Sequence, residues 1–172
     1  KLMKIHYLKT FLFLFYVGDA AALPDCSVPG ELNNCYGTKV LENRTYVGDW
    51  QDGKQHGQGS LTFEDGSKYV GGFKNSMYNG SGTFTWVDGG KYIGEFEDDA
   101  FDGEGTLYFS DGGKYIGGFT KNKKSGQGTL ISPDGDKYVG EFKEGLKNGQ
   151  GTYTWTDGRT QTGLWQKDAF ID

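Results

Sequence analysis

The side chains that could carry out chemistry are few, and the first is His56. It is one of two histidines in the chain, and the other, His6, lies within the first 22 residues. An imidazole can act as a general base near neutral pH. However, the residues at successive 23-residue offsets from His56 are Asn79, Asp102, Ser125 and Asn148. We therefore interpret His56 as a surface-loop residue. No nucleophile elbow accompanies it, and the sequence assigns no catalytic residue.

A cluster of carboxylates at Asp98, Asp99 and Asp102 raises the question of a metal site. Such a cluster offers several hard oxygen ligands of the kind that Ca²⁺ prefers, but its spacing does not match an EF-hand loop. We favour a solvated acidic loop and predict no metal site. The recurring Gly-x-Gly pairs are not followed by a helix, so they are packing devices and not nucleotide-binding motifs. No cofactor is predicted.

Two cysteines, Cys26 and Cys35, precede the first full repeat. In an oxidising compartment, a chain with two cysteines most simply forms one disulfide. The alternative is lipidation of Cys26, because Leu23 lies three residues before it, but Pro24 and Asp25 replace the small residues of a lipoprotein signal. The spacing and the lack of further ligands exclude a CxxC redox pair and a zinc site.

The first 22 residues differ in composition from the rest. Three lysines come before a short apolar run at residues 11–17, and three alanines at 20–22 follow it. This order is typical of a secretory signal peptide, and the run is far shorter than the ~20 residues of a membrane span. We predict cleavage after Ala22 and a secreted or periplasmic protein. Met3 is a candidate true start.

A strict repeat of 23 residues governs most of the remaining chain. Each unit has the order Tyr-x-Gly-x-aromatic, then Gly-x-Gly, then Asp-Gly. The residues that open the units are Tyr46, Gly48 and Trp50; Tyr69, Gly71 and Phe73; Tyr92, Gly94 and Phe96; Tyr115, Gly117 and Phe119; Tyr138, Gly140 and Phe142. A fixed period of this length is the signature of a repeat architecture.

Side-chain alternation predicts that each unit is a β-hairpin. Tyr69, Gly71 and Phe73 share one face of a strand, whereas Val70 points to the other face. The Asp-Gly step supplies the positive φ of a tight turn, and the six residues 74–79 are expected to form the other loop. Aromatic rings laid over strand glycines explain the glycine content. We favour the interpretation that these rings cover their own sheet.

The five units, spanning residues 37 to 165 with their flanks, resemble the MORN (membrane occupation and recognition nexus) repeat family. The resemblance implies an all-β fold, an elongated single-layer antiparallel meander of tandem 23-residue β-hairpins. It implies no chemical activity. Members of the family serve mostly as protein-interaction and dimerisation scaffolds, and some have been linked to phospholipids.

The expected organisation has four parts. Residues 1–22 are the signal peptide, and residues 23–45 are an N-terminal cap with the two cysteines and a half-repeat. Residues 46–160 are five full repeats, and residues 161–172 are a degenerate closing strand. Terminal units that depart from the pattern are expected of such arrays.

Charge limits the choice of partner. The chain has a net charge of −5, and removing residues 1–22 leaves 15 basic and 22 acidic residues, a net charge of −7. This balance disfavours nucleic acid and simple adhesion to anionic lipid. The one basic cluster, in residues 121–124, is expected to be a solvated loop.

Variation between repeats falls in the five predicted loops, at residues 51–56, 74–79, 97–102, 120–125 and 143–148. The candidate interaction residues in these loops are Met77, Tyr78, Asp98, Asp99, Lys121, Lys123, Lys124 and Leu146. Rigid repeats with variable loops suit a binding module. We predict a non-enzymatic, exported scaffold at the cell envelope that binds another protein or itself. Peripheral phospholipid binding and carbohydrate or cell-wall binding remain the alternatives.

Overall fold

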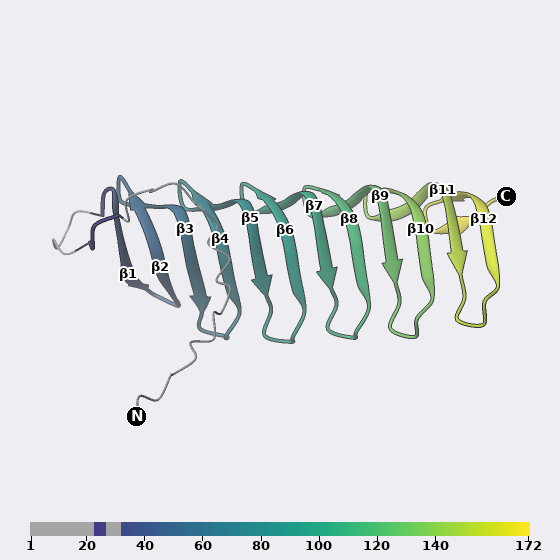
Figure 1. Cartoon of the computed structure of the whole chain (residues 1–172), viewed down its shortest axis with the longest axis horizontal. Helices are drawn as coiled ribbons and strands as arrows, with labels where there is room; N and C mark the ends of the chain where they lie inside the picture. The colour runs from purple at the N-terminus through teal and green to yellow at the C-terminus, as the bar shows by residue number, and fades with distance from the viewer. Residues whose placement is uncertain (1–22, 27–31) are drawn as a thin grey trace, which may run out of the picture.

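A computed structural model describes residues 23–26 and 32–172. Within these residues the chain forms one sheet of 13 strands, and every strand pairs antiparallel with its neighbours in sequence. Figure 1 shows the resulting row of similar hairpins, with the two ends of the sheet far apart. The expected all-β meander is confirmed. No helix in the described part of the chain is long and apolar enough to span a membrane.

The strands follow one another along the whole array. Their bounds are β1 (Cys35–Leu41), β2 (Arg44–Gln51), β3 (Lys54–Phe63), β4 (Lys68–Lys74), β5 (Met77–Thr85), β6 (Lys91–Glu97), β7 (Ala100–Tyr108), β8 (Lys114–Thr120), β9 (Lys123–Ile131), β10 (Lys137–Lys143), β11 (Leu146–Thr154), β12 (Thr160–Gln166) and β13 (Ala169–Phe170).

The Asp-Gly steps form the turns along one long side of the sheet. Between β3 and β4, the Phe63 N–H donates to the Ser67 carbonyl at 2.9 Å, and the Gly66 N–H donates to the Phe63 carbonyl at 3.0 Å. Gly66 has a φ of +91°. This is a three-residue loop that ends in a left-handed glycine. The same pair of hydrogen bonds recurs in the next four repeats, which confirms the predicted role of Asp-Gly.

The turns on the opposite side are shorter than the six-residue loops predicted from the sequence, and that prediction is wrong. β4 and β5 are joined by Asn75 and Ser76 alone, with φ values of +53° and +70°. Positive φ at both central residues defines a type I′ turn, whose twist matches that of the flanking strands. The other residues of the expected loops belong to strands. The equivalent turns are 52–53, 98–99, 121–122, 144–145 and 167–168.

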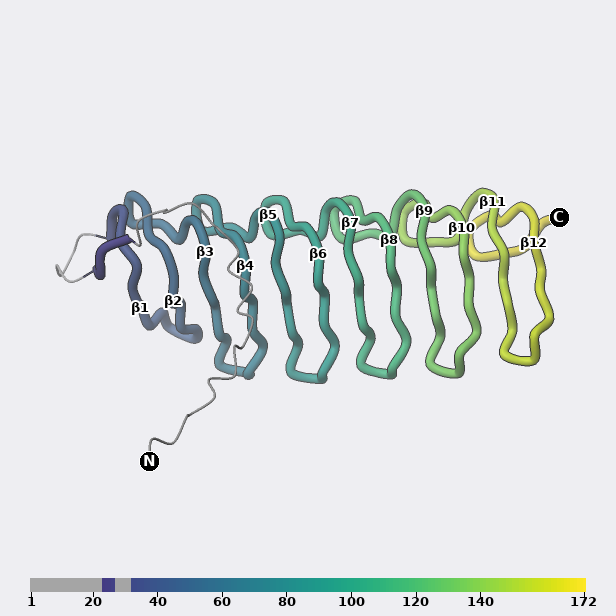
Figure 2. The backbone as a smooth tube through the Cα atoms, viewed as in Figure 1, coloured from purple at the N-terminus to yellow at the C-terminus, as the bar shows by residue number. Residues whose placement is uncertain are grey.

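A register shift lies next to five of these turns, all except the one at residues 167–168, and it bends the sheet. In the β4–β5 hairpin, Gly71 pairs with Gly82, but Phe73 already pairs with Tyr78. The additional residues of β5 include Gly80, which has a φ of +76°. Extra residues in one strand of a pair bend that strand. Figures 1 and 2 show the hairpin ends with the short turns folding back over one side of the sheet.

The core lies on the face toward which the sheet bends, here called the aromatic face. The Tyr69 ring has no exposed surface. It packs edge-on against Phe73 at 5.1 Å and Phe96 at 5.0 Å, and it stacks on Tyr78 at 3.8 Å between ring centroids. The same fully or almost fully buried tyrosine recurs at positions 46, 92, 115 and 138. Edge-to-face and stacked rings of this kind stabilise the sheet beyond simple area burial.

Both ends of the array are closed by additional backbone contacts. At the N-terminal end, Cys26 and Cys35 form the predicted disulfide, and the Tyr36 N–H donates to the Pro24 carbonyl at 2.8 Å. At the C-terminal end the expected single closing strand is wrong, because residues 160–170 contain both β12 and β13. A type I′ turn at residues 167–168 allows the chain to reverse there once more.

Candidate interaction surfaces

The face opposite the aromatic rings, here called the outer face, carries a continuous row of aliphatic and hydroxyl side chains. Strand pairing places one residue of each strand from β1 to β12 in this outer row. The pairing continues in the same way to β12. Its members are Thr38, Val47, Ser60, Val70, Thr83, Ile93, Thr106, Ile116, Thr129, Val139, Thr152 and Thr162. From Val47 to Thr152, an aliphatic residue alternates with a hydroxyl residue at every step.

Exposed apolar side chains are concentrated on this face. Among the described residues, twelve large hydrophobic side chains are exposed, and strand alternation places eight of them on the outer face. These eight are Tyr36, Val40, Val70, Ile93, Tyr108, Ile116, Val139 and Leu164. Ile93 and Val70 keep 42% and 47% of their surface exposed although they lie in the middle of strands. Exposed apolar side chains that gather on one face mark an interaction site more often than scattered ones do.

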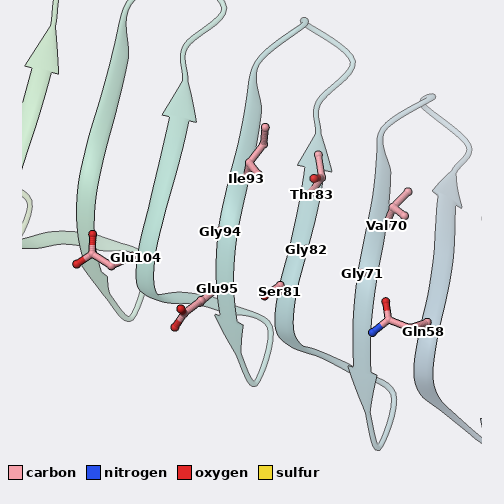
Figure 3. Close-up of a pocket in the computed structure, with 10 residues that line it drawn as sticks. All are labelled: Gln58, Val70, Gly71, Ser81, Gly82, Thr83, Ile93, Gly94, Glu95 and Glu104. Atoms are coloured by element: carbon pink, nitrogen blue, oxygen red, sulfur yellow. The ribbon is translucent and has the colours of Figure 1, made fainter. Parts of the chain in front are cut away.

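Charged rows of opposite sign flank the outer row. Two residues before the aliphatic position, on the side of the Asp-Gly turns, lie Lys68, Lys91, Lys114 and Lys137. On the other side lie the carboxylates of Asp49, Glu95, Glu104 and Glu141. Figure 3 shows Glu95 and Glu104 on one side of Ile93 and Thr83. These four residues help to line a shallow hollow of about 540 Å³. Within two residues of the outer row, this face therefore has a basic side, a middle of aliphatic and hydroxyl groups, and an acidic side.

The buried tyrosines of the aromatic face have satisfied hydroxyl groups. The Tyr69 hydroxyl donates to the Gly72 carbonyl at 2.9 Å, and the Tyr92 hydroxyl donates to the Glu95 carbonyl at 3.0 Å. Burial raises the pKa of Tyr92 and of Tyr115 to about 12. These phenols are therefore neutral at physiological pH and serve packing. The interpretation that the rings cover their own sheet is confirmed.

Five of the candidate loop residues lie in strands, among them Lys123 and Lys124 at the start of β9. Met77 and Tyr78 are the first two residues of β5, and the Tyr78 ring covers Tyr69. Phe101 occupies the equivalent position in the next repeat and stacks on Tyr92 at 3.8 Å. Leu146 likewise begins β11 and is exposed. Tyr78 therefore belongs to the core of the protein and not to a variable loop, because the short turn leaves its position inside the hairpin.

The acidic residues of the predicted loop join neighbouring hairpins. Asp98 and Asp99 form the turn between β6 and β7. The Tyr78 N–H donates to Asp99 Oδ1 at 2.7 Å, and the Lys121 N–H donates to Asp102 Oδ2 at 3.2 Å. Ser76, Asn122 and Asp168 accept the equivalent hydrogen bond from the preceding hairpin. Within residues 23–26 and 32–172, no group of three or more potential ligands could hold a metal ion.

The three candidate lysines do not form one basic patch. Lys121 lies in a turn, and Lys123 forms an ion pair with Glu144. Lys124 turns to the aromatic face, where its Nζ lies 5.7 Å from the centre of the Tyr115 ring and 5.4 Å from that of Phe142. Burial lowers the pKa of Lys124. Lys124 thus covers its tyrosine as Tyr78 and Phe101 do, which removes it from a lipid-facing cluster.

The remaining reactive side chains have structural roles. His56 lies inside β3 and not in a loop, and its carbonyl accepts a hydrogen bond from the Tyr46 hydroxyl at 3.4 Å. Both cysteines of the chain are joined in the disulfide. Cys26 therefore has no thiolate to offer for lipidation. The predicted signal peptide lies outside the described residues.

A scan against protein families matches the MORN repeat in five consecutive segments, 46–68, 69–91, 92–114, 115–137 and 138–158. A comparison with curated proteins gives no match. Among solved structures, the chain is similar to the TCP domain of SAS-4 (dCPAP) of Drosophila melanogaster, solved in complex with a proline-rich motif of Ana2 (dSTIL). That similarity covers 74% of this chain and 70% of the other, at 12% identity and a TM-score of 0.47, and we draw no argument from it.

Proposed function

The chain belongs to the MORN repeat family, and on that premise we propose that it is an exported, non-enzymatic scaffold that binds protein through its outer face. The observation that carries the proposal is the outer row, which runs unbroken from β1 to β12. Its aliphatic members stay partly exposed in the middle of strands. A rigid sheet that presents apolar groups in register needs no ordering on binding, which reduces the entropic cost of association.

A non-enzymatic role agrees with what the candidate catalytic groups do. The cysteines are oxidised to a disulfide, and the buried phenols are held neutral. His56 contributes its backbone carbonyl to the packing of Tyr46. A nucleophilic hydroxyl needs a base within hydrogen-bond reach. Among the residues that line the hollow of Figure 3, no hydrogen bond joins the hydroxyls of Ser81 or Thr83 to the carboxylates of Glu95 or Glu104.

Export is supported by the disulfide between Cys26 and Cys35. Disulfides persist in oxidising compartments and are rare in the cytosol. We propose that residues 1–22 direct the chain to the cell envelope or the medium and are then removed. Mass spectrometry of the protein from its native host should find Leu23 as the first residue. Retention of residues 1–22 on a cytosolic, reduced protein would contradict this.

Site-specific photocrosslinking in the native host tests the proposed binding face. A benzophenone amino acid replaces Ile93 or Ile116 on the outer face, and the matched control carries it at Asn122 in a turn. We expect protein adducts from the two outer-face positions and few from the control. Equal adducts at all three positions, or none, would overturn the proposal.

Phospholipid and carbohydrate, the two alternative ligand classes, are tested in separate experiments. Co-sedimentation with anionic liposomes at physiological salt would place the chain on membranes. Binding to a glycan array would indicate that the hydroxyl groups of the outer row bind carbohydrate. Either result without protein adducts would replace the proposed protein partner.

A further inference from the structure

The charges on the outer face are arranged so that the face is complementary to itself. We infer that the protein bound by the outer face is a second copy of this chain, packed face to face with both arrays running in the same direction. This inference rests on the proposed use of the outer face for protein binding. It identifies the partner and its orientation from the charged rows on each side of the outer row.

Two strands show the complementarity within single triplets of outward residues. In β6 the order is Lys91, Ile93 and Glu95, and in β10 it is Lys137, Val139 and Glu141. In each strand the lysine lies two residues before the outer-row residue, and the glutamate lies two residues after it. A half-turn about a line along the outer row exchanges the two sides. Lys91 of one copy then faces Glu95 of the other, and Ile93 faces its own counterpart.

A third lysine finds its carboxylate on a neighbouring strand. Under the same half-turn, Lys114 of β8 faces Gly118 of the second copy, which has no side chain. Gly118 pairs with Glu104 of β7, so this carboxylate lies directly beside it. Three of the four lysines in the basic row thus meet an acidic partner in both directions. The twofold symmetry doubles each of these contacts, as in any isologous dimer.

Only one relative direction of the two arrays is compatible with these charges. A half-turn about the strand direction would also bring the outer faces together, but it would reverse the arrays. Lysine would then face the lysine row, and carboxylate would face the acidic row. Like-charge juxtaposition is costly and is a common means of suppressing wrong partners. The charged rows therefore select parallel arrays, whereas the apolar row supplies the contact.

The size and shape of the face suit a dimer. Twelve strands at a spacing of ~4.8 Å give a row roughly 53 Å long. Five residues across each strand add a width of about 15 Å, so the face measures roughly 800 Å². A standard interface buries about that area on each partner. Figure 1 shows that the strands from β3 to β12 keep nearly one direction. The outer row therefore twists little along the array, and the faces of packed sheets lie ~10 Å apart.

Charge reversal in the full chain tests both the surface and its orientation. One variant carries Lys91→Glu with Lys137→Glu, and the other carries Glu95→Lys with Glu141→Lys. Sedimentation velocity and light scattering measure the mass over a concentration series, and far-ultraviolet circular dichroism checks that each variant is folded. The matched control, Lys121→Glu with Lys167→Glu, makes the same charge change in two turns. At the equivalent turn position the chain itself carries Glu144.

We expect the wild type and the control to form a dimer of about twice 19.0 kDa. Each reversed variant alone should dissociate, with a dimer dissociation constant raised by about 100-fold, because like charges then face each other. Mixing the two variants should restore a heterodimer, since every facing pair again has opposite charges. A fold defect in one variant cannot produce that rescue.

Three results would overturn the inference. They are a wild type that is monomeric at every concentration, reversed variants that dimerise like the wild type, and a mixture that fails to associate although both variants are folded. If the protein is a monomer but its outer face still forms adducts with another protein in the crosslinking experiment, only the inference of a second copy as partner is wrong. A monomer without such adducts would remove the proposed binding function as well.

Discussion

The ring of Tyr69 occupies the space that a side chain at Gly82 would need. A Cβ added to Gly82 would lie 2.5 Å from the Tyr69 hydroxyl oxygen and 2.7 Å from two ring carbons. The same relationship joins Tyr92 to Gly105 and Tyr115 to Gly128. Each repeat thus locks its buried tyrosine over a glycine of the next strand, which explains why the period contains glycines at fixed places.

Replacing Gly82 with alanine should therefore destabilise the protein by about 2–3 kcal/mol, because the buried ring must move to admit the methyl group. The control is Gly89→Ala, where φ is +88° but no atom lies within 4 Å of the added Cβ. Backbone strain alone should cost about 1 kcal/mol there. Chemical denaturation measures the free energy of unfolding of both variants. A Gly82→Ala loss no larger than the control would show that the ring does not fill this space rigidly.

Phenylalanine at position 124 should stabilise the fold. Lys124 lies over Tyr115 and its pKa is lowered by burial, so the folded state disfavours its charge. Phe101 at the equivalent position stacks on Tyr92 at 3.8 Å. We expect Lys124→Phe to gain about 1 kcal/mol in thermal or chemical unfolding. Lys123→Ala, which removes only an exposed ion pair, should change stability by less than about 0.5 kcal/mol. A destabilised Lys124→Phe variant would contradict the stacking argument.

Alkaline pH should unfold the sheet cooperatively. Burial raises the pKa of Tyr92 and Tyr115 to about 12, whereas an unfolded tyrosine titrates near 10. The folded state therefore holds these protons more tightly. Their stabilising contribution is complete below about pH 10 and is lost as the pH rises toward 12. Phenolate absorbance should appear together with the loss of β circular dichroism. Ionisation of all tyrosines near pH 10 with the sheet intact would be inconsistent with their burial.

Removal of the disulfide should loosen one end of the array only. A double Cys26→Ala and Cys35→Ala variant loses the link across a sequence separation of 9 residues, worth on the order of 2–3 kcal/mol in the chain-entropy account. Repeats contact only their neighbours, so the effect should fade along the array. Hydrogen exchange should lose protection in β1 and keep it in β10 and β11. Uniform loss across all strands would indicate that the whole sheet opens as one unit.

The sequence by itself determined the period, the hairpin unit, the Asp-Gly turns and the pairing of the two cysteines. It also assigned Tyr69 and Phe73 to one face and Val70 to the other, because side chains alternate along a strand whatever its neighbours are. These features depend on residue type and on short-range geometry. The hairpin unit and its Asp-Gly turn are repeated five times with little change, so each copy supports the same prediction. The cysteine pairing could be predicted because the chain has only two cysteines.

The surfaces depended on the tertiary structure. The predicted six-residue loops are two-residue turns in the structure, because positive φ at both turn residues allows the strands to continue up to the turn. Tyr78 and Lys124 therefore cover buried tyrosines and do not lie in loops. The outer row and its charged sides arise from the register between strands. The three-residue loops set that register on one side of the sheet, and the shifts beside the short turns set it on the other. Residues such as Lys114 and Glu104, which lie ten positions apart in the sequence, enter one surface only through that pairing. Spacing along a single strand contains no such information, because cross-strand neighbours are fixed by turn length and bulges.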